Sequence, residues 1–97
     1  MKTYTLTKSP VKGKRFRIDM NDHHHDFGSD VGKTYIEHGD NKIKQAWIAR
    51  HRKDKNWANF HSGIFMSRSL LWGPYKSLDK NIKEYERQYN VKIINRT

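Results

Sequence analysis

The most hydrophobic part of the chain is the stretch Ser62–Gly73, which lies in an otherwise polar sequence. Its large apolar side chains are Ile64, Phe65, Met66, Leu70, Leu71 and Trp72. Ile64, Arg68, Leu71 and Trp72 fall near positions i, i+4, i+7 and i+8, and Phe65 and Leu70 widen this stripe. That is the spacing of a helix and not of a strand. Because most faces of such a helix are apolar, we expect it to lie in the centre of the protein with the other elements packed around it.

The ends of this central helix also have signals in the sequence. Ser62 is a suitable N-cap, since its hydroxyl can accept a hydrogen bond from an amide two or three residues further on. Gly73 is expected to adopt the left-handed conformation that ends a helix, and Pro74 prevents the helix from continuing.

The pattern of side chains in the N-terminal third of the chain predicts strands. Residues Arg15–Met20 alternate strictly between polar and apolar side chains, which indicates a strand with one buried face. Asn21-Asp22 is a plausible two-residue turn, and His23–Phe27 would return as the second strand of a hairpin. A weaker, Thr-rich alternation within Met1–Pro10 suits a further strand.

The remaining elements are two helices and a short C-terminal strand. One helix is expected to begin at Asp40 or Asn41 and to run through His51. Another is expected to begin at Ser77 and end near Asn90. Its apolar stripe comprises Leu78, Ile82, Tyr85 and Tyr89, spaced 4, 3 and 4 residues apart.

Two shorter stretches complete the pattern. Val91–Ile94 predicts a final strand, and Thr34–Ile36 is compatible with a short strand or with the start of a turn. The expected architecture is a small α+β domain spanning residues 1–97, with a core from about 14 to 94. It would consist of a β-hairpin and one or two extra strands packed with three short helices.

Composition restricts the classes of function. The 97 residues carry 20 Lys and Arg against 10 Asp and Glu, which gives a formal net charge of +10. Such a charge favours polyanionic partners, either nucleic acid, an anionic membrane surface or an acidic protein. There is no cysteine, so neither a disulfide nor a thiolate metal site is expected. No apolar run approaches the length of a membrane span and no signal peptide is recognisable, so the chain is expected to be intracellular and soluble or part of an assembly.

Two groups of cations are the candidate binding residues for a polyanion or a protein partner. The hairpin group comprises Lys12, Lys14, Arg15 and Arg17, and the second group, beside the first long helix, comprises Arg50, Arg52, Lys53 and Lys55. Trp57 and Phe60 follow the second group and could stack on bases if they are exposed. The alternatives are a solvated face for the cations and a core position for the tryptophans.

Other chemistry has weaker support in the sequence. In a strand, His23 and His25 would share one face and His24 the other, so at most two of them could reach one metal ion. A hairpin followed by a helix is also the element order of a ββα-metal nuclease, with His51 or His61 as the general base. However, His51 stands between two arginines, and no paired carboxylates or phosphate-binding loop accompany it. We therefore expect no enzyme activity, no metal, no cofactor and no small-molecule substrate.

Several strings together resemble a known family. In chain order they are KRFRIDM, DFG, KTYIEHGD, WIARHRKDKNW, GIFMSRSLLWG and SLDKNIKEY. They resemble small basic proteins, of uncharacterised function, of nucleocytoplasmic large DNA viruses such as the phycodnaviruses and other giant viruses. The similarity runs from about Lys14 to Tyr89, and its most specific parts are Tyr35–Asp40, Arg50-His51 and Leu-Leu-Trp at 70–72. The NDHHH tip of the hairpin departs from the family, whose members usually have a Gly-containing turn there.

The resemblance implies a viral origin and two possible roles. The first is a minor capsid protein that cements the capsid lattice through aromatic anchors and a basic surface. Its partners would be the major capsid protein, other minor capsid proteins and the anionic membrane, and it would reside in virions assembled in the host cytoplasm. The alternative is a non-sequence-specific nucleic-acid-binding protein associated with the viral DNA.

Overall fold

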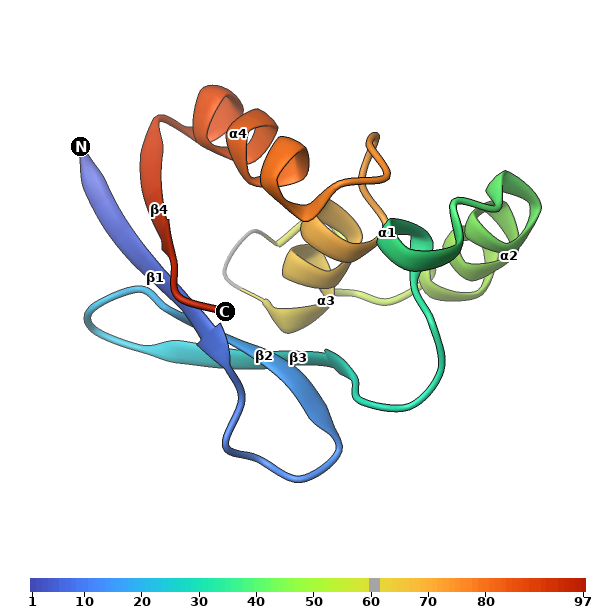
Figure 1. Ribbon diagram of the computed structural model, residues 1–97, viewed down its shortest axis with the longest axis horizontal. Coiled ribbons are helices and arrows are strands. Elements are labelled where there is room, and N and C mark those ends of the chain that lie inside the picture. Colours follow the sequence, from blue (N-terminus) through green and yellow to red (C-terminus); the bar gives the residue numbers. More distant parts are fainter. Residues whose placement is uncertain (60–61) are drawn as a thin grey trace.

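Strands at both ends of the chain form one sheet, and the helices between them lie together on one side of it (Figure 1). The structure is a computed structural model that describes residues 1–59 and 62–97. The strands are β1 (Lys2–Lys8), β2 (Lys14–Asp19), β3 (His24–Ser29) and β4 (Val91–Asn95). The helical elements are α1 (Tyr35–His38), α2 (Asn41–His51), α3 (Gly63–Met66), the π-helical turn η1 (Ser67–Leu71) and α4 (Leu78–Tyr89).

The sheet is mixed and has the strand order β3-β2-β1-β4. The predicted hairpin is present, with Phe16 opposite Phe27, and Met20 N donates to His23 O at 2.8 Å across the Asn21-Asp22 turn. β1 pairs with β2 in antiparallel orientation and with β4 in parallel orientation. The α+β prediction is therefore confirmed, with two strands added to the hairpin and one more helix than the three predicted.

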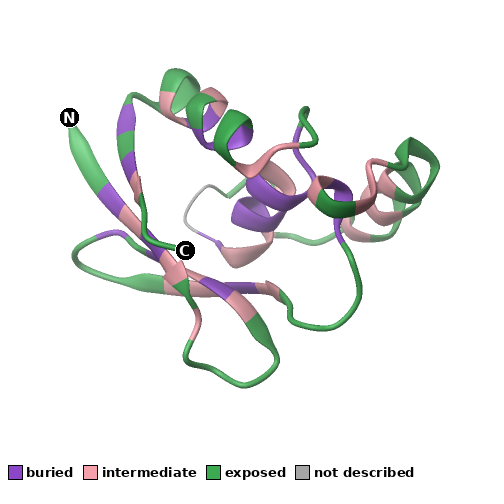
Figure 2. Cartoon of the chain, viewed as in Figure 1, coloured by how far each residue is buried: buried purple, intermediate pink, exposed green. Residues whose placement is uncertain are grey.

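The sheet buries the face that the alternation predicted (Figure 2). Its buried residues are Tyr4, Leu6, Phe16, Ile18, Met20, Phe27, Val91 and Ile93. Leu6 has no exposed surface because β1 is an interior strand. The predicted core range of 14 to 94 was therefore wrong at its N-terminal end, since Tyr4 and Leu6 belong to the core.

The central hydrophobic helix is confirmed at its start and differs at its end. Ser62 caps α3 by accepting a hydrogen bond from Phe65 N, as predicted. The last turn is π-helical: Trp72 N donates to Ser67 O at 3.0 Å. The prediction of a left-handed Gly73 was wrong. Gly73 instead serves close packing, because a Cβ there would lie 2.3 Å from Ser69 O.

The stretch around Thr34 forms neither a strand nor a simple turn. It caps α1, where Thr34 N donates to Glu37 Oε1 at 2.8 Å in the reciprocal arrangement of a capping box. Asp40 is the N-cap of α2, as predicted, and accepts from Lys42 N and Ile43 N. The predicted cap at Ser77 is also present and accepts from Lys80 N.

Helix α2 differs from the others because none of its residues is buried (Figures 1 and 2). It lies at the opposite end of the molecule from β4, and its attachments include a ring contact and a hydrogen bond. Trp47 stacks on Trp72, and Lys44 Nζ donates to Gly73 O at 2.7 Å. None of the helices in the described part of the chain is long and apolar enough to cross a membrane.

Candidate functional site

The hairpin cations are only partly available for a ligand. Arg15 makes two hydrogen bonds to Glu37, at 2.6 and 2.7 Å, and Arg17 makes two to Asp26, at 2.9 and 3.1 Å. Both pairs are fork-like arrangements that use the donors a phosphate would need. Lys12 and Lys14 are exposed, and their side chains have no hydrogen-bond or ion-pair partner among the described residues.

The Arg15–Glu37 pair perturbs the carboxyl group. Partial burial alone would raise the pKa of Glu37. The hydrogen bonds from Arg15 and from the backbone and side chain of Thr34 outweigh that effect and lower the pKa from its ordinary 4.5 to about 2. The pKa of Asp26 is lowered in the same sense, chiefly by the hydrogen bonds from Arg17 and Ser9.

A pH dependence of stability follows from the lowered pKa of Glu37. Below pH 4.5 the unfolded chain binds a proton at Glu37 while the folded chain does not, so the stabilisation present at neutral pH is lost as the pH falls toward 2. Glu37→Gln should therefore flatten the loss of stability over this range, as measured by urea unfolding at a series of pH values. Asp30→Asn is the control, because no described residue bonds that exposed carboxylate. If the stability of Glu37→Gln fell with pH as steeply as that of the wild type, the proposed effect of the Arg15–Glu37 ion pair would be contradicted.

The second predicted group of cations is free. The side chains of Arg50, Arg52, Lys53 and Lys55 are exposed, and none forms a hydrogen bond or ion pair with a described residue. Residues 41–55 contain six lysines and arginines against a single aspartate, Asp54. We call Arg50, Arg52, Lys53 and Lys55 the α2-end cluster. It combines exposure with little compensating negative charge, which is the condition for attracting a polyanion.

Aromatic rings form a column beside this cluster. The ring of His51 lies 4.5 Å from that of Trp47, and Trp47 lies 4.9 Å from Trp72 with the planes 9° apart. His38 packs on the far side of Trp72 at 5.5 Å. His51 Nδ1 lies 2.9 Å from Trp47 O and must donate to it, because a carbonyl oxygen only accepts.

Trp57 is held more tightly than a free stacking platform would be. It is half-buried against Trp47, at 5.7 Å between ring centroids, and the guanidinium of Arg68 lies 4.5 Å from its ring centroid. Arg68 Nη1 also donates to Trp57 O at 2.8 Å. Phe60 and His61, the other candidates from this loop, lie outside the described residues.

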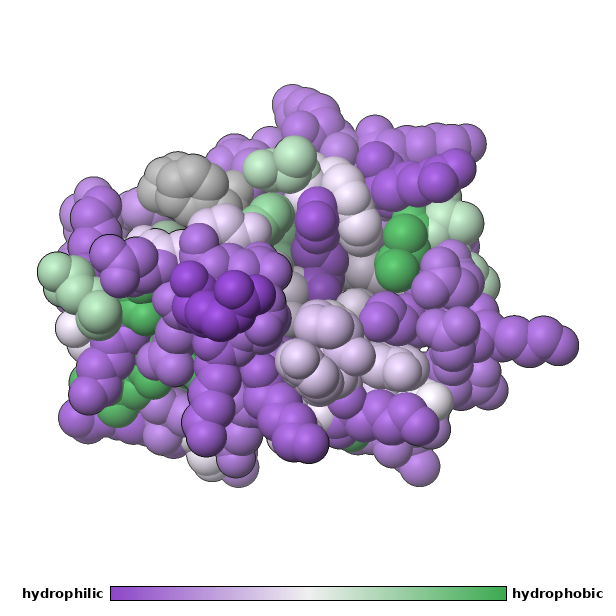
Figure 3. Space-filling model, turned by 90° about the horizontal axis from the view of Figure 1, so that it is seen from above, coloured by the Kyte–Doolittle hydropathy of each residue, from purple (hydrophilic) through white to green (hydrophobic). Residues whose placement is uncertain are grey.

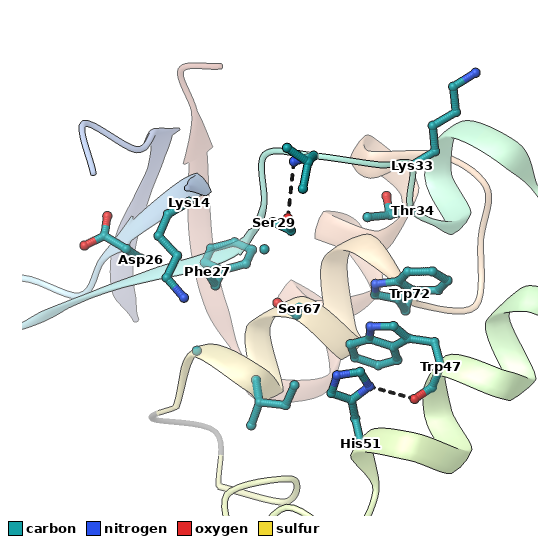
Figure 4. Close-up of a pocket in the computed structure, with 14 residues that line it drawn as sticks. Lys14, Asp26, Phe27, Ser29, Lys33, Thr34, Trp47, His51, Ser67 and Trp72 are labelled. Atoms are coloured by element: carbon teal, nitrogen blue, oxygen red, sulfur yellow. Dashed lines mark hydrogen bonds between the residues drawn. The ribbon is translucent and has the colours of Figure 1, made fainter. Parts of the chain in front are cut away.

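A cavity of about 450 Å³ lies between β3 and the aromatic column (Figure 4). Its walls include Lys14, Phe27, Trp47, His51, Ser67 and Trp72. Lys14 of the hairpin group and His51 therefore line the same cavity. His51 stands between Arg50 and Arg52 in the sequence. A second hollow of about 540 Å³ at the end of the hairpin shares Lys14, Ser29 and Lys33 with this cavity. We call these two adjoining hollows the hollowed surface; Lys14 and Arg15 of the hairpin group line it, and His51 lines it beside the second group.

The histidine run forms local contacts at the hairpin. His23 Nδ1 lies 2.7 Å from Asp22 Oδ1, the rings of His23 and His25 meet edge-on, and His24 Nε2 lies 3.9 Å from Asp26. Among residues 1–59 and 62–97, no group of three or more His, Asp or Glu side chains is placed to hold a metal ion.

Comparison with known proteins gives one finding. Residues 4–51, just under half of the chain, match a family described as "Family of unknown function (DUF5754)". The matched part contains β1, β2, β3, α1 and α2, so the chain is similar to that family over the hairpin and the projecting helix. The family has no assigned function, and the viral origin stays a prediction. No match was found among curated proteins or among solved structures.

Sequence reasoning missed several residues of this region. Ser67 and Lys33 line the cavity, yet neither was singled out as a candidate binding residue. The Thr-x-x-Glu pattern of Thr34 and Glu37 was a usable signal, since it is the sequence signature of a capping box, and it would have located α1.

Proposed function

We propose that the protein is a non-enzymatic module that binds nucleic acid through its phosphate backbone, without reading sequence. The observation that supports this role best is the α2-end cluster: four exposed cations, unpaired among the described residues, at the C-terminal end of a helix that projects from the body and in the turns that follow it. Cations of this kind neutralise phosphates and release counterions, which gives affinity without sequence preference. Of the two roles that the sequence predicted, this was the alternative.

The hollowed surface gives the strand a path beyond the cluster. It extends from His51 at the end of α2, past Lys14 and Lys33, to Ser9, and Lys12 lies on the loop between β1 and β2 that follows Ser9. Arg15 and Arg17 are engaged by carboxylates, so they fix the shape of the hairpin and contribute little net charge. The binding residues of this proposal are therefore Lys12, Lys14 and the α2-end cluster.

The salt dependence of binding to a short DNA duplex tests this role. Replacing all four residues of the α2-end cluster with glutamine should weaken binding and reduce the slope of log K against log salt by up to about 3–4, because each phosphate contact contributes about 0.9. Fluorescence anisotropy at several salt concentrations measures both quantities.

A charge-matched control separates the cluster from the net charge. Replacing Lys76, Lys80, Lys83 and Lys92 with glutamine makes the same change from +10 to +6, since +10 − 4 = +6, at four other exposed positions. This variant should keep most of the affinity and slope. Equal weakening in both variants would mean that only the overall charge acts, and unchanged binding in the cluster variant would overturn the proposal.

A structural role in a large DNA virus particle is the second candidate. Its support is a set of exposed apolar side chains that could sit in neighbouring proteins: Met1, Val11, Val31, Ile43, Tyr75 and Tyr89. The face in Figure 3 shows hydrophobic residues as small separate spots among hydrophilic ones. Among the described aromatic residues only Tyr75 and Tyr89 are exposed, so few of the expected aromatic anchors are available. Retention of the protein in capsid shells at high salt would favour this candidate, and its loss with the DNA would contradict it.

A further inference from the structure

The cavity between β3 and the aromatic column contains hydrogen-bond donors that no described residue uses. Ser67 is 6 % exposed, and its hydroxyl has no partner among the described residues. The indole N–H groups of Trp47 and Trp72 likewise donate to none of them. All three groups line one cavity and are accessible there, so they are available to donate to the acceptor oxygens of a ligand.

Their orientation supports this reading (Figure 4). The indole nitrogens of Trp47 and Trp72 lie on the edges of their rings that face Ser67, and the hydroxyl of Ser67 points into the same opening. The ring faces themselves are occupied, because the two tryptophans stack on each other, His51 stacks on Trp47, and His38 packs against Trp72 with the ring planes 58° apart. The column therefore presents donating edges to a ligand and no free face on which a base could stack.

The charged groups of the cavity are also arranged to suit an anionic ligand. The ammonium of Lys14 lies beside Phe27 on the wall opposite the tryptophans (Figure 4). The carboxylate of Asp26 also lines the cavity, but it points away and is bonded by Arg17 and Ser9. Lys33 extends toward solvent in this structure. The interior of the cavity therefore offers hydrogen-bond donors and the ammonium of Lys14. The negative charge of Asp26 is already compensated by Arg17.

We propose that this cavity is a binding site for a phosphomonoester, carried by a free mononucleotide or by the end of a nucleic-acid strand. The terminal oxygens of such a group accept hydrogen bonds, and its charge complements Lys14. Phe27 and Ile64 give the cavity an apolar side for the body of the ligand, and a volume of about 450 Å³ lies within the range of small-molecule sites. This site contains no residue of the α2-end cluster, although it shares Lys14 with the proposed path of the phosphate backbone.

The three tryptophans give a direct test. In a ¹⁵N-labelled sample, adenosine 5′-monophosphate should shift the indole N–H signals of Trp47 and Trp72, while that of Trp57, which does not line the cavity, should stay in place. Adenosine, which lacks the phosphate, should shift neither. No shift at millimolar nucleotide, or equal shifts with adenosine, would overturn the proposal.

Two variants establish which groups bind. Ser67→Ala and Lys14→Gln should each lower the affinity for the nucleotide by about tenfold, which is the effect of losing one hydrogen bond to a charged group. Each is checked for an unchanged NMR spectrum away from the cavity. Lys92→Gln, at an exposed position of β4 that does not line the cavity, is the control for Lys14 and should bind as the wild type does. Wild-type affinity in both Ser67→Ala and Lys14→Gln would overturn the site.

Oligonucleotides distinguish the two sources of the phosphomonoester. If a strand end is the ligand, a short oligonucleotide with a 5′ phosphate shifts the same two signals, and its unphosphorylated counterpart does not. If only the mononucleotide shifts them, the ligand is a free nucleotide. The variant with the α2-end cluster replaced by glutamine should keep the nucleotide shifts even where it loses duplex binding. Parallel loss of both would place the phosphate at the cluster and overturn the separate site.

Discussion

Leu71→Ala is expected to lower the free energy of unfolding by about 2–5 kcal/mol, the range for a leucine removed from a closed core. Leu71 has no exposed surface and lies where η1 meets β3. Its packing is close, because a Cβ on Gly28 of β3 would lie only 2.7 Å from Leu71 Cδ1. Because the packing is this close, we expect the cost to lie in the upper part of the range.

Urea unfolding measured by tryptophan fluorescence checks this value. The matched control is Ile43→Ala, which removes apolar atoms from a side chain that is 47 % exposed on α2. That change should stay within about 0.5 kcal/mol, as surface substitutions usually do. If Leu71→Ala were as mild as the control, the central position of η1 in the core would be wrong.

Asn81→Ala is expected to destabilise the protein by about 2–4 kcal/mol. Asn81 is 1 % exposed and connects α4 to the segment after η1. Its Nδ2 donates to Leu70 O and to Tyr75 O, both at 3.0 Å, and its Oδ1 accepts from Tyr75 N at 2.9 Å. Alanine would leave these backbone groups without partners, and each unsatisfied buried group costs about 1–3 kcal/mol. The better helix propensity of alanine offsets less than about 1 kcal/mol of this loss.

Thermal and urea unfolding of the variant test the role of Asn81. Lys83→Ala lies in the same helix with an exposed side chain, so it shares the change in propensity and should be nearly neutral. A loss below about 0.5 kcal/mol for Asn81→Ala would mean that water replaces the amide without cost. The turn that includes Gly73 would then not depend on Asn81.

The α2-end cluster and the cavity differ in how they arise from the sequence. The cluster is contiguous, so its charge is visible in the chain, and a polar helix leaves it exposed wherever the helix lies. The cavity brings Lys14 of β2 to Ser67 and Trp72 of the central helical segment, which lies far along the chain from Lys14. The sequence contains no spacing that relates them, and the family match over residues 4–51 covers only Lys14 of the three.

Periodicity and cap residues determined the local structure of this protein. The alternation at Arg15–Met20 predicted the buried face of β2, and Ser62, Ser77 and Asp40 marked helix starts correctly, because these signals depend on neighbours a few residues away.

Only the tertiary structure decided which elements meet. The parallel pairing of β1 with β4 joins the two ends of the chain, and Arg15 meets Glu37 across 22 positions. The burial of Asn81 and the close packing of Gly73 against Ser69 O also depend on how α4 lies against η1. A hydrophobic pattern reports that a face is buried but carries no information about the partner that covers it, so these contacts follow from the packing of the whole chain.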